Sequence, residues 1–157
     1  MLLRVLAPIF NRFPVRWQRR VLTAAHTRFL VGVMGIGVAP DGRVMIAEHR
    51  FGAPRWRFLG GFLGEGELPE DALAREVRQE TGIEIEVGPI LAAVPGHRWR
   101  LVQLVYAYRP LAGAFVPSGE VKDLRTFAPD ELPGVRADQR GLIERHWREA
   151  VEWARTR

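Results

Sequence analysis

The segment from residue 69 to residue 81 constrains the fold most, because it has the pattern of one amphipathic helix set among short apolar stretches. Pro69 suits the first turn of a helix, where its missing N–H is not needed. Three positions four residues apart lie on one face: Leu73, Val77 and Thr81. Gly82 then ends the helix. Leu68 stands where Ser or Asp would cap the free N–H groups, so the helix start depends on other partners.

Short apolar stretches on either side of this helix predict β-strands. The glycine-dotted run 29–39 and the run 44–47 are joined by the turn residues 40–43 and predict a hairpin of buried strands. Further strands are expected at four places: 56–59, 83–94, 100–109 and 121–127. With 157 residues, the chain is long enough for one domain with a full hydrophobic core. Strands around one central helix and one terminal helix predict a mixed α/β sandwich.

The end of the chain predicts a second helix, capped by Asp138. Five apolar residues share one face of it: Ile143, Trp147, Ala150, Val151 and Ala154. We therefore divide the chain into a basic N-terminal segment, residues 1–28, and one folded domain, residues 29–157.

The N-terminal segment carries the chain's positive charge. Residues 1–28 contain six arginines and no acid, whereas the net charge of the whole chain is +5. Apolar groups at helical spacing, interrupted by Pro8 and Pro14, predict two short basic amphipathic helices. Such a segment could pack on the body or on a second subunit of a homodimer, lie on an anionic membrane, or bind RNA phosphates. Packing is the commonest of these fates.

The absence of cysteine removes several function classes. The chain has none, which excludes disulfides, zinc–thiolate sites, iron–sulfur clusters and thiol nucleophiles. No apolar run reaches the ~18 residues of a membrane span. The first ten residues are broken by Arg4 and Pro8, so we do not interpret them as a secretory signal. The expected location is the cytoplasm.

Two glutamates of the central helix indicate a metal site. On a helix that advances about 100° per residue, Glu76 and Glu80 lie about 40° apart and on the same side. Two like charges one turn apart repel unless a cation or an arginine lies between them. Carboxylate oxygens suit Mg²⁺ or Mn²⁺, which bind through a few carboxylates together with substrate phosphates. The pattern therefore predicts a phosphate-containing substrate.

The region around these glutamates resembles the signature box of the Nudix hydrolases, G-x5-E-x7-R-E-U-x-E-E-x-G-U, where U is a bulky aliphatic residue. Eight of its nine specified positions match: Gly61, Glu67, Arg75, Glu76, Val77, Glu80, Gly82 and Ile83. Segments 56–61, 120–123 and 127–133 are also similar to parts of the family, so the resemblance covers about residues 29–133. It implies a Nudix-type α/β/α sandwich with a mixed sheet.

The resemblance also implies roles for individual residues. The family cleaves a nucleoside diphosphate linked to another group X, with divalent metal ions at the pyrophosphate. Glu76 and Glu80 become metal ligands, and the carbonyl of Gly61 becomes a backbone ligand. Arg75 holds the acidic cluster in place, and Glu67 supports it from the loop. For a further carboxylate from the opposite loop we favour Glu120 over Asp123.

Gln79 departs from the family pattern, which has glutamate there. Its amide oxygen can still bind a cation, but it removes one negative charge from the site. The first hypothesis is an active pyrophosphohydrolase dependent on Mg²⁺ or Mn²⁺. The alternative is a nucleotide-binding or regulatory module with weak or no turnover.

Substrate contacts outside the box are expected at Trp56, Arg57, His97 and Arg98. Trp56 could stack on a base, whereas the aromatic residues Phe58, Tyr106 and Tyr108 are expected in the core. Cationic and aromatic groups around residues 97–100 could bind a phosphate or a base, although a plain exposed loop fits equally well. Nothing in these residues identifies the group X.

Overall fold

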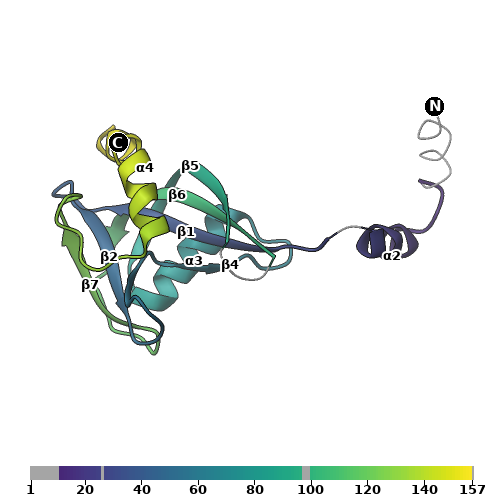
Figure 1. Cartoon of the computed structure of the whole chain (residues 1–157), viewed down its shortest axis with the longest axis horizontal. Coiled ribbons are helices and arrows are strands. Elements are labelled where there is room, and N and C mark those ends of the chain that lie inside the picture. Colours follow the sequence, from purple (N-terminus) through teal and green to yellow (C-terminus); the bar gives the residue numbers. More distant parts are fainter. Residues whose placement is uncertain (1–10, 26, 97–99, 157) are drawn as a thin grey trace.

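A computed structural model describes residues 11–25, 27–96 and 100–156 of the chain. Within them, seven strands form one sheet with a helix on each face, and a further helix precedes it (Figure 1). In chain order the elements are α2 (Val15–Ala25), β1 (Leu30–Val38), β2 (Val44–His49), β3 (Trp56–Arg57), β4 (Gly60–Phe62), α3 (Pro69–Thr81), β5 (Glu84–Pro95), β6 (Leu101–Ala112), β7 (Val121–Phe127) and α4 (Ala137–Arg155).

The sheet is mixed, and β1 lies at its centre. The strand order is β3-β2-β1-β6-β5, with β7 paired to β2 and β4 paired to β1. Strands β1 and β6 are parallel, whereas the other pairs are antiparallel. The end of β1 pairs with β2, and its beginning pairs with β4, where Val33 lies opposite Gly61. Strand β4 is thereby held beside the central strand.

Alternating side chains of the central strands build two separate cores. On the face covered by α3, Val33 and Tyr106 pack with Leu73 and Val77 of the helix. The residues between them point to the other face, where a second core joins Met34, Ile36, Ile46 and Val105 to Leu142 and Ile143 of α4. Strands that are apolar on both faces need such cover from two layers. The predicted α/β/α sandwich with a mixed sheet is confirmed.

Helix α3 begins and ends as its sequence predicts. Leu68 occupies the N-cap position and makes no side-chain cap. Gly82 ends the helix in the left-handed conformation, with φ of 75°, and its N–H donates to the carbonyl of Arg78. Leu73, Val77 and Thr81 are all buried.

Two local expectations were wrong. Asp138 does not cap α4, because Arg136 occupies the N-cap position and its guanidinium binds both carboxylate oxygens of Asp138, at 3.0 and 2.8 Å. The expected strand 56–59 stops at Arg57, and a separate strand that the sequence did not predict, β4, begins at Gly60. Gly60 has a φ of 150° and lies so close to the backbone of β1 that a side chain would overlap it.

Helix α2 stands apart from the sandwich, joined to it through the residues that lead into β1 (Figure 1). Its large apolar residues are exposed, so the expected packing on the body is not observed. Part of the N-terminal segment, residues 1–10, lies outside the described residues, and so does the first of the two predicted helices. No helix among the described residues is long and apolar enough to cross a membrane.

Tyr108 depends on glycine in the central strand. Its fully buried ring lies against Gly35 and Gly37, where a methyl group would overlap the ring atoms. We expect Gly37→Ala to lower the free energy of unfolding by roughly 1–3 kcal/mol, because overpacking forces the core to shift. Gly134→Ala, where nothing lies within 4 Å of the new methyl group, is the control. Equal denaturation midpoints for the two variants would contradict this account of the core.

Candidate active site

The carboxylate of Glu76 lies directly against the backbone of Gly61. Strand β4 brings Gly61 under α3, and a methyl group on this glycine would overlap the Glu76 carboxylate. Any larger residue at position 61 would therefore displace the carboxylate. The structure brings the Glu76 carboxylate against Gly61, a residue fifteen positions earlier in the chain.

Arg75 organises the acidic residues around this contact. Its guanidinium binds both oxygens of Glu67, with Nε to Oε1 at 2.8 Å and Nη2 to Oε2 at 3.0 Å. The same group donates to Oε1 of Glu76 at 2.9 Å and to the carbonyl of Phe62 at 3.2 Å. Such charge-assisted bonds fix direction as well as distance. Arg75 therefore connects the loop before α3, strand β4 and the helix itself.

Glu67 serves this network as an ionised anchor. The hydrogen bonds from Arg75, and after them the N–H of Gly64, lower the pKa of Glu67 to about 2. The hydrogen bonds to Glu67 and Glu76 raise the pKa of Arg75 above its usual value. Both residues stay charged at neutral pH.

Glu80, one turn beyond Glu76, has the opposite electrostatic setting. It is 7% exposed, and burial raises its pKa to about 7, with the negative charges of Glu120 and Glu76 adding to the effect. The N–H of Gly60 donates to its Oε2 at 3.4 Å and partly offsets the shift. A buried carboxylate among other carboxylates is destabilised unless a cation compensates it.

Glu80 and Gly61 border an open cavity of about 690 Å³ between β4, the loop before β3 and the start of α4, whereas Glu76 is not among the residues that line it. Its lining includes Glu80, Glu120, Gly61, Arg57 and Arg136. Burial lowers the pKa of Arg57, the charge of Arg136 adds to this, and Glu80 opposes it. Two guanidinium groups thus face the same cavity as two carboxylates, an arrangement that suits a phosphate bridged to a metal ion.

The donor set fits a hard divalent cation. Carboxylates of Glu76 and Glu80 and the backbone of Gly61 supply oxygen only, and Glu76 rests in the space that a side chain at position 61 would fill. In the described parts of the chain no three His, Asp or Glu residues are already grouped to hold an ion. Mg²⁺ commonly takes one or two carboxylates and completes its shell with water and substrate phosphate.

The remaining predicted site residues are placed less uniformly. Gln79 is exposed, and its Oε1 accepts a 3.4 Å hydrogen bond from Arg75. Glu120 lines the cavity, whereas Asp123 is paired with Arg125 at 2.6 Å, which favours Glu120 as the further carboxylate. Trp56 is not among the residues that line the cavity, and its ring packs edge-on against Phe127. His97 and Arg98 lie outside the described residues.

Three residues of the cavity carried no recognisable signal in the sequence. Gln139 is buried, and its Oε1 accepts the N–H of Phe58 at 3.0 Å, which ties α4 to the entry of β4. His49 is buried, and burial followed by the charge of Arg57 lowers its pKa to about 4, so the imidazole is neutral at pH 7. Arg136 immediately precedes α4. Only tertiary packing brings these residues to the glutamates of α3.

Comparison with known proteins identifies the family. The model of the NUDIX domain matches residues 28–146 of this chain. The chain belongs to the Nudix family of hydrolases. The resemblance found in the signature box is thereby confirmed, as is the assignment to this class of enzyme. Nudix hydrolases generally use divalent metal cations.

Individual relatives support the same conclusion. A MutT-like protein from Streptomyces ambofaciens is 35% identical over 102 residues, which cover 65% of this chain and 66% of that protein. An NAD-capped RNA hydrolase NudC from Stutzerimonas stutzeri is 32% identical over 108 residues, covering 66% of this chain and 39% of its own length. The crystal structure of a UDP-X diphosphatase has a TM-score of 0.70 at 24% identity and covers 98% of this chain and 80% of its own. This Nudix chain thus spans between about two fifths and two thirds of the length of the two curated relatives.

The raised pKa of Glu80 predicts a pH-dependent stability. The ionised form is disfavoured in the folded state, so the metal-free protein loses stability as the pH rises from 4.5 through 7. Glu80→Gln removes the charge and keeps an acceptor for Gly60. We expect this variant to be more stable than the wild type at pH 8 by roughly 1–3 kcal/mol, and equal to it below pH 4.5.

Urea denaturation in the presence of a chelator, at pH 4.5 and pH 8, measures this difference. Glu84→Gln, at an exposed position just after α3, is the control and should change stability by less than about 0.5 kcal/mol. A Glu80→Gln variant that is less stable than the wild type at pH 8 would contradict the electrostatic assignment.

Proposed function

We propose that this chain is a metal-dependent pyrophosphohydrolase that cleaves a nucleoside diphosphate linked to another group X, using Mg²⁺ or Mn²⁺. One observation carries the proposal: the Glu76 carboxylate rests on Gly61, and Gly61 lines a cavity together with buried Glu80 and two arginines. Within the Nudix family, this combination supports a metal site that faces a phosphate site.

Each residue has a definite task in this mechanism. Glu76, Glu80 and the backbone of Gly61 would hold the cation, and Glu120 is positioned to add a carboxylate from the opposite loop. Arg75 sets the direction of Glu76 through its hydrogen bonds. When bound, the metal neutralises pyrophosphate oxygens and activates a water molecule.

The cavity's arginines supply the second half of the binding site. Arg57 is held by the carbonyl of Phe51, to which its Nη2 donates at 2.7 Å, while its Nε has no hydrogen-bond partner. That Nε is buried, but the guanidinium as a whole lines the cavity and carries the charge that a phosphate would pair with. With Arg136 nearby, it would orient the part of the pyrophosphate farther from the metal.

The substrate class proposed is a nucleotide or nucleotide sugar. The similar proteins include hydrolases of NAD-capped RNA, RNA pyrophosphohydrolases and, among the solved structures, a UDP-X diphosphatase. Each of these names refers to a substrate that contains a nucleoside phosphate. Their named substrates differ in the group attached to it. The shared chemistry therefore supports the diphosphate, and not one particular X.

A second candidate function is a nucleotide-binding or regulatory module with weak turnover. Gln79 favours it, because this exposed amide faces Arg75 where the family pattern has a carboxylate. Loss of one negative charge weakens the attraction for a second metal ion.

Hydrolysis of a panel of compounds tests the main proposal. The compounds are ADP-ribose, NAD, UDP-sugars, dinucleoside polyphosphates and nucleoside triphosphates. We expect the wild type, with Mg²⁺ or Mn²⁺, to hydrolyse at least one of them, and phosphorus NMR detects the phosphate-containing products. Glu76→Gln and Glu80→Gln should each lower kcat/KM by at least about 100-fold, because each removes a metal ligand. Exposed Glu84→Gln should not. A wild type that binds nucleotides and cleaves none would favour the regulatory module.

Restoring the family residue at position 79 tests the role of charge. Gln79→Glu should lower the metal concentration at half-maximal activity several-fold, because the new carboxylate adds negative charge beside Arg75. Gln79→Ala, which removes the amide but adds no charge, is the matched control and should not lower it. A metal titration with no difference between Gln79→Glu and the wild type would show that position 79 does not contribute to metal affinity.

A further inference from the structure

Helix α2 takes no part in the candidate active site, yet its side chains are fully sorted. At about 100° per residue, its polar half holds Arg16, Arg19, Arg20 and Thr23 within an arc of about 100°. The opposite half holds Val15, Trp17, Val21, Leu22 and Ala24. Gln18 alone falls among the apolar residues, and its Nε2 is turned back to donate to the carbonyl of Phe13 at 2.7 Å.

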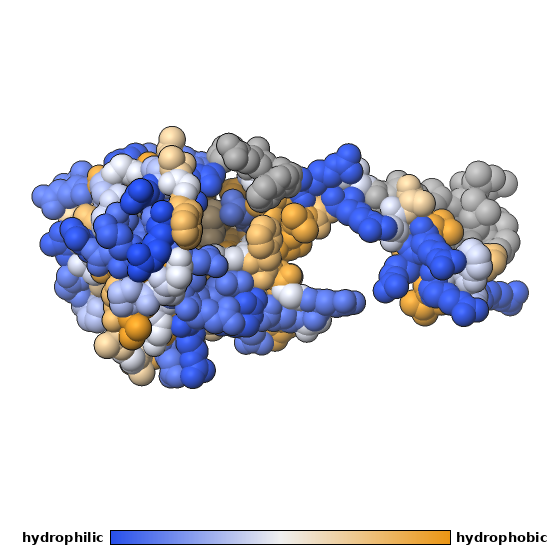
Figure 2. Space-filling model, turned by 90° about the horizontal axis from the view of Figure 1, so that it is seen from below, coloured by the Kyte–Doolittle hydropathy of each residue, from blue (hydrophilic) through white to orange (hydrophobic). Residues whose placement is uncertain are grey.

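Within the described part of the chain, the apolar half has no partner outside α2 itself, where Arg20 lies over the Trp17 ring at 5.2 Å. Val15 is 77% exposed, Trp17 49%, Val21 52% and Leu22 45%. Figure 2 shows orange hydrophobic atoms beside blue hydrophilic ones on a helix that is separated from the body. Bulky apolar residues gathered on one side of an isolated helix mark an interaction surface.

Three of the four residues in the polar half are arginines. Arg16 faces Arg20 at a spacing of four residues and Arg19 at three, where like charges repel. The first acidic residue of the chain is Asp41, so no carboxylate in residues 11–40 compensates them. The first turn of α2 likewise has no acid to favour its positive end. The three arginines therefore repel one another in the free helix, and a negatively charged partner would relieve this repulsion.

We propose that α2 docks this protein onto the surface of a membrane containing anionic phospholipids. The helix would lie in the plane of the interface, with Trp17, Val21 and Leu22 among the acyl chains and the arginines at the head groups. An RNA strand would compensate the arginines and leave the apolar half exposed. A second copy of the chain would cover the apolar half and leave the arginines uncompensated. An anionic bilayer satisfies both halves at once.

A second apolar feature lies on the same side of the body. Phe29 and Leu30, where α2 leads into β1, are 56% and 51% exposed. Phe62, opposite Gly32 across the β1–β4 pair, is 50% exposed. Figure 2 shows hydrophobic residues gathered at the end of the body that faces α2. A helix anchored in a bilayer would bring this end of the sheet toward the same surface.

Co-sedimentation of the full-length chain with vesicles tests the proposal. We expect binding to vesicles of phosphatidylglycerol and phosphatidylcholine, little binding to phosphatidylcholine alone, and weakening as salt rises. The double variant Arg16→Gln/Arg20→Gln should bind at least about 10-fold more weakly. Trp17→Ser/Val21→Ser should also bind at least about 10-fold more weakly, because it removes the largest inserting groups.

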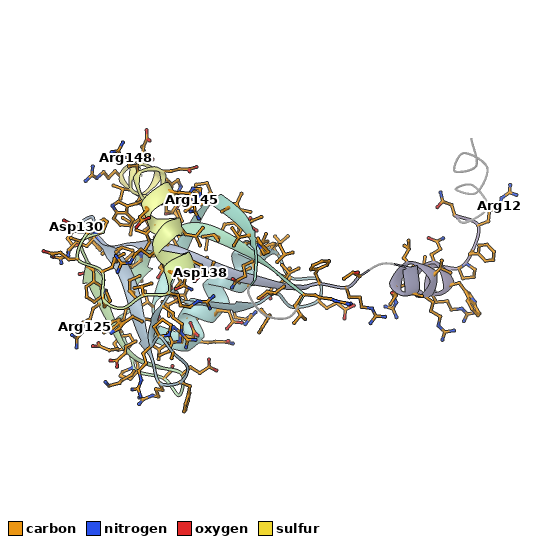
Figure 3. All side chains as sticks on the ribbon, viewed as in Figure 1. Arg12, Arg125, Asp130, Asp138, Arg145 and Arg148 are labelled. Atoms are coloured by element: carbon orange, nitrogen blue, oxygen red, sulfur yellow. The ribbon has the colours of Figure 1, made fainter. Side chains whose placement is uncertain are left out.

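Matched controls separate docking from general charge and hydrophobicity. Arg145→Gln/Arg148→Gln removes the same charge from exposed positions on α4, far from α2 (Figure 3), and should retain binding. Leu111→Ser/Val116→Ser removes exposed apolar residues of the body and should also retain it. Unchanged thermal melting of the four variants would show that each leaves the body folded.

Three results would overturn the proposal. The first is absence of binding to anionic vesicles by the wild type. The second is equal loss of binding in the α2 and α4 arginine variants, which would indicate diffuse charge attraction. The third is that α2 binds RNA, seen by gel shift, or forms a concentration-dependent dimer, seen by analytical ultracentrifugation, while the chain does not bind vesicles.

Discussion

The contact between Glu76 and the backbone of Gly61 is the constraint on which the candidate site depends. It requires a residue without a side chain on β4, a helix that crosses this strand closely, and an arginine that directs the carboxylate. Pairing with β1 fixes the position of β4 in the sheet, and the core residues Leu73 and Val77 fix the position of α3 over the sheet. The packing of α3 on the sheet therefore determines the position of the Glu76 carboxylate in the candidate site.

Around this contact the protein treats neighbouring carboxylates in opposite ways. Glu67 is partly solvated, and two hydrogen bonds from Arg75 compensate its negative charge, so its pKa falls. Glu80 is buried without a cation of its own, so its pKa rises to about 7. The first arrangement stabilises the fold, whereas the second stores an electrostatic cost that a bound cation removes. A metal ion would thus stabilise the folded protein as well as enable its chemistry.

Most of the local structure could be predicted from the spacing of apolar residues and from the prolines and glycines that begin and end helices and strands. Helix α3 was predictable because Pro69, the apolar residues at intervals of four and Gly82 all act within the segment itself. The Asp138 cap was not, because an aspartate can pair with a nearby arginine as readily as with a helix N-terminus, and here Arg136 takes its carboxylate. Strand β4 was missed because its two glycines adopt extended backbone only through pairing with β1.

For this protein, the sequence alone determined the family and the charge asymmetry of the N-terminal segment, and it predicted Glu76 and Glu80 as metal ligands, because all three follow from residue type and spacing. Only the tertiary structure decided which distant residues share the cavity. His49, Arg57 and the neighbouring pair Arg136 and Gln139 come from three separate parts of the chain, and Trp56 turns to the core instead. Their meeting depends on sheet pairing and on the packing of α4, which act between residues far apart in the chain and leave no periodic signal within it.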